Sequence, residues 1–176
     1  MASPKSSSMG HAFESYVRML MMREELEART FDSRPAVGKR HEDYKELKQL
    51  TLPKCTAMRL RQNIAQAVLD EPEPGILFHP VSEYFPLIDF CFKAPNNTYY
   101  AVQVTNSTTH DANLGKIEAL KNELDPFNSH ELKLIYAIPY DYINKFVTNP
   151  VDVRVVGVTA IVIGIPNPSE GMEERR

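Results

Sequence analysis

Apolar residues recur at helical spacing in three segments of this chain. The clearest segment lies near the N-terminus, where residues at offsets of four, seven and eight form one apolar face: Phe13, Val17, Leu20 and Met21. This spacing predicts a helix from about Met9 to Arg29. Further helices are expected over Met58–Asp70, before a break rich in proline, and over Ala112–Leu124.

Short apolar runs bounded by turn residues predict the strands. The runs are Leu50–Leu52, Ile76–His79, Pro86–Lys93, Tyr99–Thr105, Leu132–Pro139, Val153–Val158 and Ala160–Ile165. Turn residues at 94–97 separate the third run from the fourth, so these two are expected to form a hairpin. The run at 132–139 is expected to be a strand buried on both faces. The polar segment Thr30–Gln49 has no clear period.

The order of helix, strands, hairpin, helix and strand predicts the fold class. It is typical of an α/β sandwich with a central mixed β-sheet flanked by helices. A chain of 176 residues fits one domain. We expect a flexible leader at residues 1–8, a folded domain at 9–166 and a charged tail at 167–176.

Composition and charge narrow the classes of function. The chain is 43% apolar and 24% charged with a net charge of -3, as expected of a soluble globular protein. This balance argues against a basic nucleic-acid-binding surface over the whole molecule, but it leaves room for a local basic rim around an acidic site. No apolar stretch reaches the roughly 18 residues that span a bilayer, and the N-terminus lacks a signal-peptide core. We therefore expect an intracellular chain without membrane association, in which Cys55 and Cys91 are reduced.

Two polar residues interrupt apolar strands in the middle of the chain. Asp89 lies in the run 87–92, and Gln103 lies in the run 100–104. A buried carboxylate must be paired, hydrogen-bonded or bound to a metal, because an isolated buried charge is costly. The expected hairpin brings Asp89 close to Gln103 or Thr105.

Glu14 is a third candidate, since it lies at the edge of the first helix's apolar face and can point across at the sheet. A cluster of Glu14, Asp89 and the amide oxygen of Gln103 suits a hard divalent cation such as Mg²⁺. Such an ion would hold a water and polarise a phosphodiester. The five histidines and two cysteines lack the spacing of a zinc site.

Three segments together resemble a PD-(D/E)XK-like nuclease domain. They are Gly10-His11-Ala12-Phe13-Glu14, Phe85-Pro86-Leu87-Ile88-Asp89, and Tyr100-Ala101-Val102-Gln103-Val104-Thr105 with His110 behind it. The likeness covers roughly Met9 to Pro166, and it is to the domain of trypanosomatid retrotransposon hot spot proteins and Crinkler-type effectors. It implies a restriction-endonuclease-like fold that cuts DNA with Mg²⁺ or Mn²⁺.

The resemblance also implies roles for single residues. Glu14 would be the helix glutamate, Asp89 the metal-binding aspartate, and Gln103 the residue at the second acidic position. Thr105 stands where a lysine normally lies, so the phosphate or the water would need another cation. Lys116 on the following helix is the first choice, and His110 could bind phosphate or shuttle a proton. A less suitable substitute for the lysine is Lys93.

Larger members of this family carry an ATPase region before the nuclease domain. No phosphate-binding Gly-rich loop ending in Lys-Ser or Lys-Thr occurs here, so a protein partner is the expected source of that region. The resemblance implies DNA as the other partner and the nucleus as the compartment, with the cytoplasm as the alternative. The chain would be a stand-alone domain or a truncated copy.

Each of these residues also has a purely structural interpretation. Asp89 could cap backbone groups at a strand end, and Gln103 could be an amide hydrogen-bonded inside the sheet. Glu14 could be a solvated residue favoured by the helix dipole, Lys116 a solvated helix lysine, and His110 a cap for the next helix. The corresponding alternative function is a catalytically inactive nucleic-acid- or protein-binding module that retains the nuclease fold. A degenerate copy without a biochemical role is a third alternative.

Overall fold

The computed structural model describes residues 8–23, 26–28, 30–32, 50–71, 73–81, 88–110, 113–143, 145–146, 148 and 155–166. The helices in these ranges are α1 (Ser8–Arg23), α2 (Ile64–Asp70) and α3 (Leu114–Leu124), with a short 3-10 helix η2 (Tyr140–Tyr142). The strands are β1 (Leu26–Ala28), β2 (Thr30–Asp32), β3 (Leu50–Leu52), β4 (Ala57–Arg61), β5 (Ile76–Pro80), β6 (Phe90–Lys93), β7 (Thr98–Val104), β8 (Glu131–Pro139) and β9 (Val158–Ile165).

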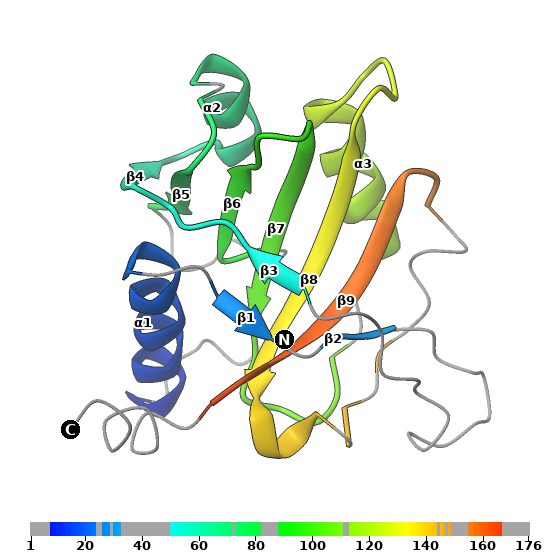
Figure 1. Cartoon of the computed structure of the whole chain (residues 1–176). Helices are drawn as coiled ribbons and strands as arrows, with labels where there is room; N and C mark the ends of the chain where they lie inside the picture. Colours follow the sequence, from blue (N-terminus) through cyan, green and yellow to red (C-terminus); the bar gives the residue numbers. More distant parts are fainter. Residues whose placement is uncertain are drawn as a thin grey trace.

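One mixed sheet forms the centre of the molecule (Figure 1). Its seven described strands follow the order β2-β9-β8-β7-β6-β5-β4, while β1 and β3 form a separate antiparallel pair. Strands β7, β8 and β9 run parallel, and so do β4 and β5. Strand β6 is antiparallel to both of its neighbours, and β2 is antiparallel to β9. Strand β4 therefore ends the sheet on one side.

Helices cover both faces of this sheet. On one face, the buried residues of α1 pack over alternate side chains of the central strands; this layer includes Val17, Leu20, Met21, Leu77, Phe90, Phe92, Tyr100, Val102 and Val104. On the other face, α2 and α3 pack over the intervening side chains; this layer includes Ile64, Val68, Ile117, Leu120, Phe78, Cys91, Tyr99, Ala101 and Tyr136. The predicted α/β class, with a mixed sheet between helices, is confirmed.

Several predicted elements are confirmed within a few residues. These are the strands at 50–52, 76–79, 99–105, 132–139 and 160–165, the hairpin of β6 and β7, and the third helix, which begins at Leu114. Strand β8 is buried between β7 and β9, as its apolar sequence predicts. Cys91 is fully buried and free, also as predicted.

Four predicted elements are wrong in part. The strand predicted over Pro86–Lys93 begins only at Phe90, so Ile88 and Asp89 precede it. The first helix ends at Arg23 instead of Arg29, and β1 follows it at Leu26. The segment Ala57–Arg61 is a strand, because it pairs in parallel with β5. The run predicted at 153–158 holds a turn at Val155–Gly157, and the strand begins only at Val158.

Asn63 explains why the second helix starts so late. Its side-chain oxygen accepts the backbone N–H of Gln66 at 3.0 Å, which caps the first turn of α2. Ser8, which we placed in the leader, is the first residue of α1. The rest of the expected leader, the charged tail, the segment 33–49 and the first residues of the run at 86–93 lie outside the described residues. No helix in the described ranges is long and apolar enough to cross a membrane.

Candidate functional site

The hairpin of β6 and β7 brings Asp89 and Gln103 together. Asp89 directly precedes β6, and Gln103 is the penultimate residue of β7. Phe90 pairs with Val102 in this antiparallel hairpin. Asp89, which precedes Phe90, therefore lies at the same end of the hairpin as Gln103, which follows Val102. Both polar residues are buried, with 8% of each exposed. The proximity that the sequence predicts is therefore present.

Two hydrogen bonds hold Asp89 against β7 on either side of Gln103. The backbone N–H of Asp89 donates to the carbonyl of Val102 at 2.7 Å, and its carboxylate Oδ2 accepts the N–H of Val104 at 2.7 Å. The carboxylate thus takes the place of a backbone acceptor where β6 has not yet begun. This is the capping role of the structural interpretation.

Gln103 points to the face of the sheet that α2 and α3 cover. Its strand neighbours Val102 and Val104 belong to the α1 layer, and side chains alternate along a strand. The amide Nε2 makes a long contact of 3.4 Å with the carbonyl of Val104. On β8, the residue paired with Gln103 is Tyr136.

His110 reaches the same neighbourhood through Tyr136. The two rings meet edge to face with centroids 5.6 Å apart. Thr105 follows β7 directly, is half-buried, and donates its backbone N–H to the carbonyl of Ala137 at 3.0 Å. The structure therefore groups Gln103, Thr105 and His110 around the end of β7, next to Asp89.

Glu14 lies on the opposite face of the sheet, with α1. Its Oε1 is 3.1 Å from Nε2 of His79 on β5, and both side chains are mostly buried. The other ring nitrogen of His79, Nδ1, lies 2.7 Å from the carbonyl oxygen of Pro80, so Nδ1 carries a hydrogen and donates it. The helix glutamate is thus engaged by a histidine and does not share the face of Gln103.

His79 is the residue that sequence reasoning missed. It lies beside Phe90 at a centroid distance of 5.6 Å, and Phe90 directly follows Asp89. The available signal was a polar residue at the end of the apolar run 76–79, the same kind of interruption that drew attention to Asp89. Its partner, 65 residues earlier in the chain, could not be read from local sequence.

The two candidate lysines lie in different places. Lys116 is exposed in the first turn of α3, where its backbone N–H is capped by the side-chain oxygen of Asn113 at 3.0 Å. Helix α3 follows the end of β7, so Lys116 lies toward the same end of the sheet as Gln103. Lys93 is the last residue of β6, at the opposite end of that strand from Asp89.

The donor set determines how well a metal would fit. Within the described ranges, no group of three or more His, Cys, Asp and Glu side chains is arranged to hold a metal ion. Asp89 and Gln103 still offer one carboxylate and one amide oxygen side by side. Mg²⁺ is commonly held by one or two carboxylates, several waters and substrate phosphates, so this pair fits such an ion. Glu14 does not complete the set, because His79 engages it.

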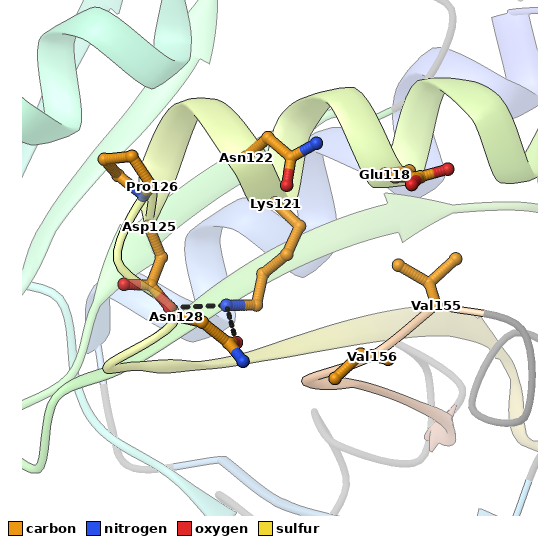
Figure 2. A pocket seen from close by; sticks show the side chains of 8 residues that line it. All are labelled: Glu118, Lys121, Asn122, Asp125, Pro126, Asn128, Val155 and Val156. Carbon is orange, nitrogen blue, oxygen red and sulfur yellow. Dashed lines mark hydrogen bonds and ion pairs between the residues drawn. The ribbon is translucent and has the colours of Figure 1, made fainter.

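A second polar cluster lies at the other end of the parallel strands. A pocket of about 280 Å³ lies between α3 and the turn before β9. Figure 2 shows the side chains that line it. The pocket is lined by Glu118, Lys121, Asn122, Asp125, Pro126, Asn128, Val155 and Val156. Inside it, the buried ammonium of Lys121 donates to the carboxylate of Asp125, to Oδ1 of Asn128 at 3.1 Å and to the carbonyl of His130 at 3.1 Å.

This cluster is saturated with its own bonds. The Asp125 carboxylate also accepts the backbone N–H groups of Ser129 at 2.9 Å and His130 at 2.8 Å. Burial would raise the pKa of Asp125, but the bonds from Lys121, His130 and Ser129 outweigh it and hold the pKa well below its ordinary value. The three donors of Lys121 match its three acceptors, so the cluster is a tie between α3 and β8.

No family model matches the chain, and no curated protein or solved structure matches it.

Proposed function

We propose that this chain is a PD-(D/E)XK-like nuclease domain with a restriction-endonuclease-like fold, acting on phosphodiester bonds of DNA. The observation that carries the proposal is the buried carboxylate of Asp89, oriented by the Val104 N–H at 2.7 Å, beside the amide of Gln103. Burying a carboxylate at the end of an apolar strand costs free energy. Proteins commonly retain such a buried carboxylate at sites that bind metal and phosphate.

The arrangement of elements supports the same proposal. A helix, several strands, the hairpin of β6 and β7, helix α3 and the parallel strand β8 follow one another, in agreement with the order predicted from the hydrophobic pattern. Helices α1 and α3 lie on opposite faces of the sheet. Four of the candidate residues lie at the end of the hairpin opposite its turn, so substrate would approach them from one end of the sheet; they are Asp89, Gln103, Thr105 and His110.

In this proposal Asp89 and Gln103 hold Mg²⁺ or Mn²⁺. When bound, the ion supplies polarisation of the phosphodiester and a water of lowered pKa. The Val104 N–H donates to the Asp89 carboxylate and fixes its orientation, as partners of ligating carboxylates commonly do. Thr105 and His110 provide hydrogen-bonding groups beside Gln103, and the exposed Lys116 attracts the phosphate.

The alternative is a binding module that retains the fold without cutting. It is favoured by the engagement of Glu14 with His79 and by the neutrality of Gln103. Of the three residues expected to bind metal, only Asp89 would then contribute a negative charge. Because a single carboxylate binds a divalent cation weakly, such a domain could bind nucleic acid equally well in EDTA.

Cleavage of supercoiled plasmid distinguishes these functions. The natural chain is compared with Asp89→Ala, and with Asp70→Ala as a control that removes an exposed helix carboxylate. We expect nicking that requires Mg²⁺ or Mn²⁺, is lost in Asp89→Ala and is retained in Asp70→Ala. In the variant Gln103→Glu, a second carboxylate should increase nicking at limiting metal. No metal-dependent nicking by the natural chain, or equal nicking by Asp89→Ala, would replace the nuclease with the binding module.

A further inference from the structure

The edge strand β4 carries two arginines that share one carboxylate. Arg59 and Arg61 alternate with Met58 and Leu60 along the strand, so they lie on one face of it. Nε of Arg59 is 3.1 Å from one oxygen of Glu71, and Nη2 of Arg61 is 3.0 Å from the other. Two positive charges therefore meet one negative charge, which leaves a local net charge of +1 on a chain whose net charge is -3.

Both guanidinium groups remain available to solvent. The side chains of Arg59 and Arg61 are 44% and 42% exposed. Each guanidinium has five N–H donors, and the bonds among the described residues use only some of them, including one from Arg61 to the carbonyl of Leu60 at 2.8 Å. Glu71 holds the two groups side by side, which lowers the entropy lost when both bind one anionic partner.

The pairing of strands places this arginine pair near the candidate site. Arg61 pairs with Pro80 on β5, and the Val81 N–H donates to the Arg61 carbonyl at 3.0 Å. Phe78 pairs with Cys91, so the same register continued by two residues sets Pro80 opposite Asp89. Arg61 and Asp89 are thus about two strand spacings apart, which is roughly 10 Å.

The two arginines lie on the same face of the sheet as Gln103 and toward the same end as Asp89. The arginines contact Glu71 at the end of α2, and α2 covers the face to which Gln103 points. Strands β4 and β5 are parallel, so the later of the two arginines lies at the sheet end where Asp89 precedes β6. In Figure 1, β4 forms the margin of the sheet beside β5 and β6.

We propose that Arg59 and Arg61, oriented by Glu71, form a rim that binds phosphates of a nucleic-acid strand crossing the Asp89 end of the sheet. This inference rests on the proposed function, because it assumes that nucleic acid is the ligand of that end. Arginine is well suited to phosphate, since its planar fork can donate two parallel hydrogen bonds. The rim supplies sequence-independent affinity, and it holds whether or not the domain cuts.

Fluorescence anisotropy in EDTA tests the rim separately from cleavage. Single- and double-stranded oligonucleotides are titrated with the full chain over a salt series, using Arg59→Ala/Arg61→Ala and Lys54→Ala/Lys93→Ala. The second variant removes the same charge near Gly75, at the other end of the same strands. Log affinity falls as log salt rises, and this slope should become less negative by about 1.4 for single strands and about 1.8 for duplex when two phosphate contacts are lost.

The outcomes separate the rim from the proposed function. A reduced slope in the arginine variant and an unchanged slope in the lysine variant support the rim. If the natural chain binds and both variants keep its slope, the rim is overturned, but nucleic-acid binding by the chain is retained. Absence of binding by the natural chain, with or without metal, overturns both. Arginine-dependent binding of a poly-glutamate peptide in place of the oligonucleotides would assign the rim to a protein partner and also overturn it.

A charge-retaining variant guards against a folding defect. Arg59→Lys/Arg61→Lys keeps both positive charges but loses the planar fork. We expect it to retain most of the salt slope, whereas a general loss of structure would abolish binding in both arginine variants. A melting temperature measured for each variant completes the comparison, and a folded alanine variant with full slope sinks the idea.

Discussion

The buried pair of Lys121 and Asp125 makes a quantitative prediction for stability. Their side chains are 5% and 2% exposed, and the pair joins the last turn of α3 to the loop before β8. Asp125→Ala removes the carboxylate that is bonded to Lys121 and leaves its ammonium buried. It also removes the acceptor for the backbone N–H groups of Ser129 and His130.

The expected cost follows from this geometry. Breaking a buried ion pair by removing one partner costs about 3–5 kcal/mol, because the remaining charge is uncompensated. In a domain of this size, each kcal/mol lowers Tm by about 2–4 °C. We therefore expect Asp125→Ala to lower Tm by roughly 6–20 °C. Lys121→Met should cost less, since Asp125 keeps its donors at Ser129 and His130.

The dependence on pH has a defined sign. The folded pKa of Asp125 lies below its ordinary value of 3.8, so its contribution is complete above that value and is lost as the pH falls through the folded pKa. The deficit of Asp125→Ala should thus be constant near neutral pH and shrink below about pH 4.

Thermal unfolding followed by circular dichroism measures the change in Tm, and urea unfolding measures the change in free energy at each pH. Asp70→Ala serves as the matched control, because that carboxylate lies on the surface of α2 and accepts a hydrogen bond from the side chain of Gln66, four residues earlier. Its cost should stay within about 0.5 kcal/mol. A cost below about 1 kcal/mol for Asp125→Ala, or a larger cost for the control, would refute the argument from burial.

Two further predictions concern Gly157 and the two buried cysteines. In Gly157→Ala the added Cβ would lie 2.8 Å from Cε of Lys121 at a φ of +78°, so we expect a loss of about 1–3 kcal/mol, measured by the same unfolding. Burial raises the pKa of the Cys55 and Cys91 thiols to about 12, so neither should react with a thiol reagent at pH 8 until the chain unfolds. Rapid labelling of folded protein would contradict that expectation.

The sequence by itself determined the elements whose causes are local. The hairpin of β6 and β7 follows from two apolar runs joined by turn residues, and its register brings Asp89 to Gln103 without any distant contact. The third helix and strand β8 were equally predictable from the sequence, because their apolar patterns are long enough to distinguish a helical period of 3.6 residues from a continuous buried run.

The secondary structure of short segments was less predictable, because it depends on partners that are distant in the sequence. The sequence predicts a helix that begins at Met58, yet pairing with β5 makes Ala57–Arg61 a strand. Five residues are too few to distinguish the period of a helix from that of a strand. The helix at the N-terminus stops at Arg23, where its apolar face ends.

Only the tertiary structure decided which polar groups meet. Glu14 contacts His79 across 65 residues, and the parallel pairing of β4 with β5 carries Arg61 toward Asp89. A pattern in the sequence records the environment that a side chain needs, such as burial or solvent. It does not record which side chain supplies that environment, because long-range pairing is set by how the sheet closes against its helices.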